Sequence, residues 1–212
     1  MNDVLLRSIA APLFGLALCF IVTPRPGAVV KEMPIAHFAG RAIDVADHAD
    51  DGPIDIMIER WSTDKERDDL VQRFVKRGPS ELLTALDDVR VRTGVILMPG
   101  VQATGARARG RRSRNLMFAR QIDTPAGRQL IVASGQHVGL GEYARWGASA
   151  DNEFTLIDIR FGPDGKGVGK AASPNNVRYN KATGTIEIAD YAKEPARLID
   201  VKIPSHARTS RS

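Results

Sequence analysis

The sequence predicts an α+β domain: a curved antiparallel sheet of seven or eight strands, with two short helices inserted after the first strand. Three observations lead to this prediction. The segment that begins at Ile54 alternates apolar and polar residues, as a half-buried strand does. Residues 63–86 then carry a helix start signal and apolar residues at helical spacing. From residue 92 onward, strand-like segments follow one another across short turns, so that neighbours must be antiparallel.

The first helix has clear ends in the sequence. Thr63 and Glu66 form the T-x-x-E pattern of a capping box, in which each side chain bonds the other residue's backbone N–H. Gly78 directly after two basic residues predicts the stop. A second helix is expected to begin at Pro79, with three leucines on one side.

The remaining chain reads as strands and hairpins. The later strand-like segments are at 92–100, 115–122, 128–135, 153–161, 167–172, 177–180, 185–191 and 196–203. The turns DTPAG, GPDGK and KATG between three pairs of them contain the Gly, Pro and Asp that tight hairpins favour. These turns predict three antiparallel pairs.

Length and composition are consistent with one folded domain. A chain of 212 residues, 43% of them hydrophobic, can bury one good core. We expect residues 1–28 to be a signal peptide or membrane anchor, 29–52 a flexible linker, 53–204 the α+β domain and 205–212 a disordered tail. The linker prediction depends on three prolines in residues 23–52 and on the absence of sustained periodicity there.

The N-terminal segment indicates export. Ile9–Val22 are fourteen residues without a charge, the length of a secretory h-region and short of the about twenty apolar residues that a spanning helix needs. A cleaved signal peptide and an uncleaved anchor both place the domain in the periplasm or at the cell envelope; a misassigned start or a buried helix is the remaining alternative. The single cysteine, Cys19, lies in this segment, so no disulfide is expected in the domain.

A basic stretch, GARARGRRSRN at residues 105–115, contains five arginines and no acidic or aromatic residue. Its candidate anion-binding residues are Arg107, Arg109, Arg111, Arg112 and Arg114. The stretch fits a solvated loop, a contact with an anionic envelope surface, or a nucleic-acid contact. Export and the lack of aromatic residues for base stacking disfavour nucleic acid.

Candidate chemistry is sparse elsewhere. No cofactor motif or metal-ligand spacing occurs, and GPDGKGVGK departs from the phosphate-loop pattern in spacing and lacks its hydroxyl, so no cofactor or metal is expected. Ser134 and His137, with Glu142 to orient the imidazole, form the best hydrolase candidate, although no G-x-S-x-G elbow is present. Trp61 and Trp146 are candidate ligand contacts, because a tryptophan at a strand end or beside glycines can line a pocket.

Four segments, IERWSTDKERDDL, FARQ, FTLIDIRFGPDGKGVGKAA and VRYNKATGTIEIADYAKEPARLIDV, carry a resemblance over residues 54–203. Together they resemble an uncharacterised family of small exported bacterial proteins, and the IERWS opening with the TIEI…EPARL ending is the most specific part. The resemblance implies export and supplies no activity, so no catalytic residue follows from it. The arginine stretch departs from the shorter, less basic segment expected in that family.

Taken together, these features predict an exported, envelope-associated binding or structural domain without catalysis. The expected partner is an anionic envelope surface or a small ligand, with membrane contact through the N-terminal segment. Two alternatives remain open: a hydrolase that uses Ser134 and His137, and a nonspecific anion binder that acts through the arginine stretch.

Overall fold

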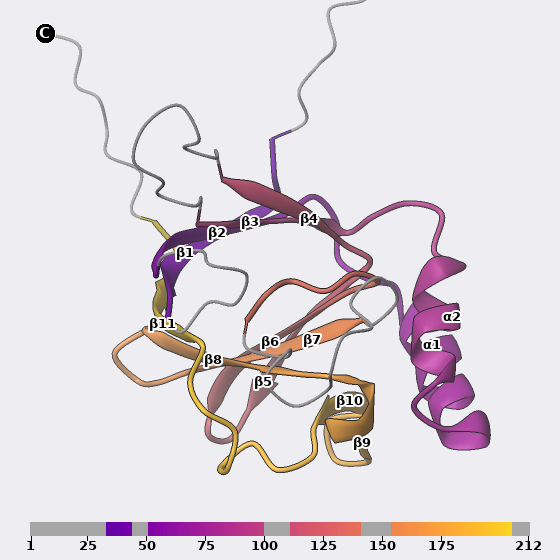
Figure 1. Ribbon diagram of the computed structural model, residues 1–212. Helices are drawn as coiled ribbons and strands as arrows, with labels where there is room; N and C mark the ends of the chain where they lie inside the picture. Colours follow the sequence, from indigo (N-terminus) through magenta and orange to yellow (C-terminus); the bar gives the residue numbers. More distant parts are fainter. Residues whose placement is uncertain (1–32, 44–50, 100–110, 141–153, 205–212) are drawn as a thin grey trace, which may run out of the picture. The chain divides into compact units, whose positions relative to one another are not determined.

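The computed structural model describes residues 33–43, 51–99, 111–140 and 154–204, which belong to one compact unit, Glu32–Ser212. Its helices are α1 (Asp64–Arg77) and α2 (Glu81–Asp87), with a short 3-10 turn at Pro174–Asn176. Its strands are β1 (Ala36–Ala42), β2 (Gly52–Ile58), β3 (Gly94–Met98), β4 (Arg112–Leu116), β5 (Phe118–Thr124), β6 (Gly127–Ser134), β7 (Thr155–Phe161), β8 (Gly167–Ala172), β9 (Val177–Asn180), β10 (Thr185–Ile188) and β11 (Leu198–Lys202) (Figure 1).

Nine strands form one antiparallel sheet in the order β4-β3-β2-β1-β11-β8-β7-β6-β5. The sheet folds back on itself, with β1–β4 in one half, β5–β8 in the other and β11 between them (Figure 1). The two outermost strands, β4 and β5, are consecutive in the chain and are separated only by Met117, whose N–H donates to the Ala133 carbonyl at 2.8 Å. The sheet is therefore nearly closed at this corner. The β9–β10 hairpin forms a separate two-stranded sheet.

The main core lies inside the folded sheet. Side chains from both halves meet there, among them Phe38, Ile56, Ile96, Val132 and Ile157, and each is at most 1% exposed. The alternation of the strands delivers these residues to one face. The burial of such apolar side chains supplies the main driving force for closing the sheet.

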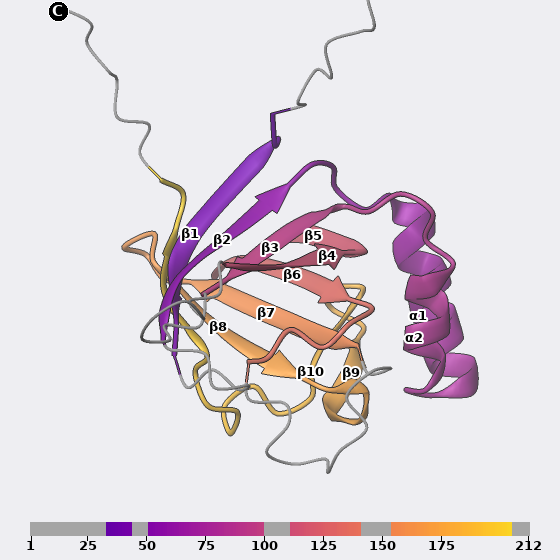
Figure 2. The same cartoon turned by 45° about the horizontal axis from the view of Figure 1, so that its top comes forward.

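A second core lies on the outer face of β5–β8. The helices and the β9–β10 hairpin cover this face, so that β6 is buried on both sides: Leu130 belongs to the inner cluster and Ile131 to the outer one. Leu86 of α2 and Ile186 of β10 belong to the outer cluster as well. Figure 2 shows the helix pair beside this half of the sheet. The candidate site lies on this outer face, beside the β9–β10 hairpin.

The local predictions for the first helix are confirmed. The Thr63 side chain accepts from the Glu66 N–H at 3.2 Å, and the Glu66 carboxylate accepts from the Thr63 N–H at 2.8 Å. Gly78 caps the helix with a φ of 89°, which glycine adopts readily. The three predicted hairpins are also present, as β5–β6, β7–β8 and β9–β10.

Several features differ from the expectation. The main sheet has nine strands instead of seven or eight, and the helices follow the second strand instead of the first. The expected strand at 115–122 is two strands, β4 and β5, so the end of the arginine stretch lies in a strand instead of a loop. The expected strands at 177–180 and 185–191 form the separate β9–β10 sheet. The strand β1 was not expected, so the prediction of a flexible linker over residues 29–52 is wrong for Ala36–Ala42. This segment is ordered because it pairs with β2 on one side and with β11 on the other. The α+β class with an antiparallel sheet is confirmed.

Several predictions fall on residues outside the described ranges. These are the signal peptide or anchor at 1–28, the tail at 205–212, Arg107, Arg109, Glu142 and Trp146. Among the described residues, no helix combines the length and the apolar character required to span a bilayer.

Candidate functional site

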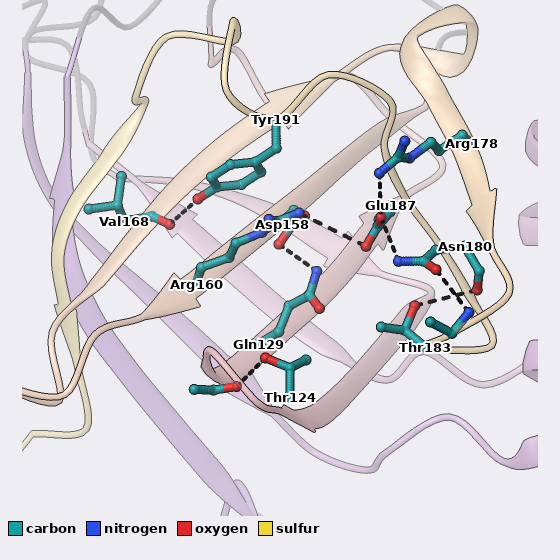
Figure 3. A network of polar contacts seen from close by, with 12 residues as sticks. Thr124, Gln129, Asp158, Arg160, Val168, Arg178, Asn180, Thr183, Glu187 and Tyr191 are labelled. Atoms are coloured by element: carbon teal, nitrogen blue, oxygen red, sulfur yellow. Dashed lines mark hydrogen bonds and ion pairs between the residues drawn. The ribbon is translucent and has the colours of Figure 1, made fainter.

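A polar pocket lies at the outer face of the sheet, where the β5–β6 hairpin approaches the β9–β10 hairpin (Figure 3). Its volume is about 270 Å³. The residues that line it are Thr124, Ala126, Gly127, Arg128, Gln129, Arg160, Phe161, Arg178, Asn180, Thr183 and Glu187. We call this set the polar pocket.

Asp158 lies beside the polar pocket, on the outward face of β7, and its side chain is fully buried. One carboxylate oxygen accepts from the Gln129 amide at 3.0 Å, and the other accepts from Arg160 at 3.1 Å. Burial raises the pKa of Asp158 above its ordinary value, and the bonds from Arg160 and Gln129 oppose this shift only in part. The group therefore holds its proton more strongly than an exposed aspartate does.

Glu187 is the carboxylate that lines the pocket, and its side chain is 4% exposed. It accepts from Arg178 at 3.1 Å and from the Asn180 amide at 2.8 Å, both on the neighbouring strand β9. Its second oxygen lies 3.9 Å from the Arg160 guanidinium. Glu187 thus ties the hairpin to β7 and fixes the position of two arginines (Figure 3).

Tyr191 covers the same network from the segment after β10. The Arg160 guanidinium lies 3.8 Å from the centre of the Tyr191 ring, and the Lys170 ammonium lies 4.4 Å from it. The Tyr191 hydroxyl donates to the Val168 carbonyl at 2.8 Å (Figure 3). Burial raises the pKa of this hydroxyl, which stays protonated as a donor. The ring therefore packs against the Arg160 guanidinium and limits its rotation.

Arg128 forms the wall nearest the β5–β6 hairpin. Its guanidinium lies 4.6 Å from the centre of the Phe161 ring. Its Nε atom is buried and has no hydrogen-bond partner among the described residues. A buried donor without a partner is unusual in a folded protein and calls for an explanation.

The polar pocket carries an excess of positive charge. Three arginines and one carboxylate line it, and Asp158 behind the wall adds one more acidic group. The guanidinium groups outnumber the carboxylates even when both are ionised. Arginine presents a planar fork of donors that matches carboxylate and phosphate oxygens. The arrangement of the polar pocket is therefore suited to holding an anion. Within the described residues, no group of three or more His, Cys, Asp or Glu could hold a metal ion.

The predicted hydrolase pair is placed unfavourably for catalysis. The Ser134 hydroxyl is on a side chain that is 1% exposed, and it accepts from the Gln136 N–H at 3.1 Å. The His137 Nδ1 lies 3.4 Å from the Gly139 N–H. A nucleophile must reach its substrate, so a buried Ser134 is poorly suited to that role. Glu142, the expected third member, lies outside the described ranges.

The described arginines of the basic stretch have partners within the protein. Arg111 bonds the Asp55 carboxylate at 2.5 Å and the carbonyls of Pro53 and Leu97. Arg114 donates to the His137 carbonyl at 3.1 Å. Burial raises the pKa of Asp55, but the hydrogen bonds from Arg111 and His37 together outweigh it, so that the pKa lies below its ordinary value. Arg111 and Arg114 therefore stabilise the fold.

Arg112 also has an interaction partner. For Arg107 and Arg109, anion binding stays a prediction. Trp61 packs against the inner core cluster and is partly buried. Packing against the core explains why a large aromatic side chain occupies this position. A ligand contact at Trp61 stays a prediction.

Comparison with protein-family models, with curated proteins and with solved structures finds no match. The resemblance to an exported bacterial family stays a prediction. The polar pocket is a candidate site that the sequence did not predict. Its signal in the sequence is weak: Asp158 and Arg160 interrupt the apolar strand FTLIDIRF, and Glu187 interrupts TIEI. A charged residue inside an apolar strand indicates a buried polar contact but not its partner.

Proposed function

We propose that this protein is an exported, envelope-associated binding domain that holds a small anionic ligand in the polar pocket and has no catalytic role. The observation that carries the proposal is the convergence of Arg128, Arg160 and Arg178 on one pocket with a single lining carboxylate. Export rests on the uncharged segment Ile9–Val22, as argued from the sequence.

The surroundings of these arginines support binding of a compact anion. Glu187 bonds Arg178 and lies near Arg160, and Tyr191 stacks on Arg160, so two of the three guanidinium groups are held before a ligand arrives. Such preorganisation lowers the entropic cost of binding. A volume of about 270 Å³ fits a small carboxylate or phosphate compound and not a polymer.

The same contacts weigh against catalysis at this pocket. A general acid or base must reach a substrate proton, whereas the Asp158 side chain is fully buried beneath Arg160 and Gln129. Glu187 already accepts from Arg178 and Asn180. Both carboxylates therefore serve to position the arginines.

Thermal denaturation with added inorganic phosphate, sulfate or citrate tests the proposal. A ligand at a hundredfold excess over its Kd stabilises a domain by about 2.7 kcal/mol, so the Tm should rise by about 5 to 10 °C for a domain of this size. Added sodium chloride should reduce the rise, because salt screens the attraction.

Two variants assign the effect to the pocket. Arg178→Gln should lose most of the ligand-induced rise in Tm, because it removes one lining guanidinium. Arg77→Gln is the matched control, since the Arg77 side chain is 71% exposed on α1 and lies outside the pocket. The same rise in both variants, or no rise with any of the three anions, would refute the proposal.

A further inference from the structure

A second cavity, independent of the polar pocket, lies between the two helices and the β4–β5 corner. Its walls come from α1, from α2 with the residues that follow it, and from Met117 and Phe118. Its volume is about 370 Å³, within the range of small-molecule sites. We call it the helix-side pocket.

The floor of the helix-side pocket is apolar. Leu70, Leu86 and Phe118 line it, and each is at most 5% exposed. Met117 is half-buried beside them, and its flexible thioether adapts to the shape of an apolar partner. A ligand with an aliphatic body would move its own chain out of water by contacting these side chains.

The rim of the helix-side pocket is charged, and most of its charges are already paired. Arg73 bonds Asp69 at 3.2 Å and Asp88 at 2.6 Å. Glu66 forms a two-pronged pair with Arg60, at 2.8 and 2.9 Å. The acidic groups of the rim are thus engaged by arginines.

Two cations of the rim are left over. Lys65 and Arg90 both line the pocket and are exposed, and neither has an acidic partner within the described part of the chain. Arg73 is shared between two carboxylates, so the lining as a whole carries three cations and three acids, and Lys65 and Arg90 are the two of these cations that make no ion pair with a described residue. An apolar floor beside these two cations is complementary to a molecule with an apolar body and an anionic head.

We propose that the helix-side pocket binds a small amphipathic anion, such as a medium-chain carboxylate, with its aliphatic chain on the Leu70–Phe118 floor and its head at Lys65 and Arg90. This site is separate from the polar pocket and does not depend on the function proposed there. Its ligand class differs as well, because three arginines line the polar pocket.

Calorimetric titration of the purified protein with decanoate, below the concentration at which it forms micelles, tests this assignment. Decanoate should bind at one saturable site, and octanoate should bind on the order of tenfold more weakly, since each buried methylene contributes about 0.8 kcal/mol. Decyltrimethylammonium, with the same chain and a cationic head, should not bind. Saturating inorganic phosphate should leave decanoate binding unchanged, which separates this site from the polar pocket.

Three variants locate the site. Val89→Trp places a bulky ring in the pocket wall and should abolish decanoate binding, and the double variant Lys65→Glu with Arg90→Glu should weaken it severalfold. Lys76→Glu changes a cation of α1 that does not line the pocket, so it should bind as the unmodified protein does. A melting curve of each variant confirms that it is folded. Absence of decanoate binding, equal binding of the cationic analogue, or undiminished binding by Val89→Trp would overturn the proposal.

Discussion

The pKa of Asp158 is set by its burial and by the contacts of its carboxyl group. Asp158 is a fully buried acid on a strand whose neighbouring residues, Ile157 and Ile159, are buried on the other face. Its contacts to Gln129 and Arg160 offset part of the cost of burying a carboxyl group. The remaining cost appears as a raised pKa.

This shift predicts a pH-dependent effect of Asp158→Asn. In the unfolded chain the carboxyl ionises near its ordinary pKa of 3.8, whereas in the folded protein it ionises only at a higher pH. Between these two pKa values the folded state holds a proton that the unfolded chain has released, so the stability of the unmodified protein falls as pH rises from 3.8 through the raised pKa, whereas an amide at this position does not titrate. The variant should gain stability relative to the unmodified protein over that window.

Urea denaturation measures the free energy of unfolding of both proteins. It should be carried out at several pH values between about 3.5 and 7, which start just below the ordinary pKa of an aspartate. Titratable groups far from Asp158 cancel in this comparison, because both proteins share them. Parallel stability curves for the two proteins would contradict the assignment of a raised pKa to Asp158.

At the scale of an element, α1 shows how much of a helix is encoded locally. The Thr63 hydroxyl accepts from the Glu66 N–H, and the Glu66 carboxylate, held by Arg60, accepts from the Thr63 N–H. The bond from Arg60 is the main cause that lowers the pKa of Glu66, so the cap is intact at neutral pH. The start of α1 is therefore joined to the end of β2 through Arg60.

Thr63→Ala should destabilise the protein by about 1 kcal/mol, because it leaves a helix N–H without its acceptor. The expected decrease in Tm is about 2 to 4 °C for a domain of this size. Ser80→Ala is the matched control: Ser80 precedes α2 but makes no side-chain capping bond, so its loss should have little effect. Equal losses in the two variants would show that the capping bond contributes nothing specific.

Elements that are encoded by residues close in sequence could be predicted, and elements that depend on distant partners could not. The helix α1 and the three short hairpins depend on residues close in sequence, such as Thr63 with Glu66, and all were predicted. The strand β1 was missed because its segment, AHFAGRA, has little β-branched character and is ordered by β2 and by the distant β11. Strand propensity is a property of the local sequence, so it cannot predict the pairing of β1 with a strand as distant as β11.

The polar pocket was missed for a related reason. Arg128, Arg160, Arg178 and Glu187 come from four strands, β6, β7, β9 and β10. They converge only once the β9–β10 hairpin docks on the outer face of the main sheet. The candidates that the sequence predicts depend on local patterns instead, and Arg111 of the arginine stretch makes contacts within the fold, to Asp55 and Leu97.

At the scale of the whole molecule, the remaining expectation concerns location. We expect cell fractionation to recover the protein with the periplasm or the envelope. If the N-terminal segment is a cleaved signal, N-terminal sequencing should give a start near residue 29; if it is an anchor, the chain should stay intact and sediment with membranes. Recovery of the intact chain from the soluble cytosol would contradict the proposal of export.

The position of β11 has a consequence for how the chain acquires its structure. This strand is the last of the described elements, yet it pairs with β1 on one side and with β8 on the other. Until Leu198–Lys202 has been synthesised, β1 and β8 each present an unsatisfied edge, and such edges invite aggregation and chaperone binding. Completion of the sheet is thus postponed until this last described strand has been synthesised.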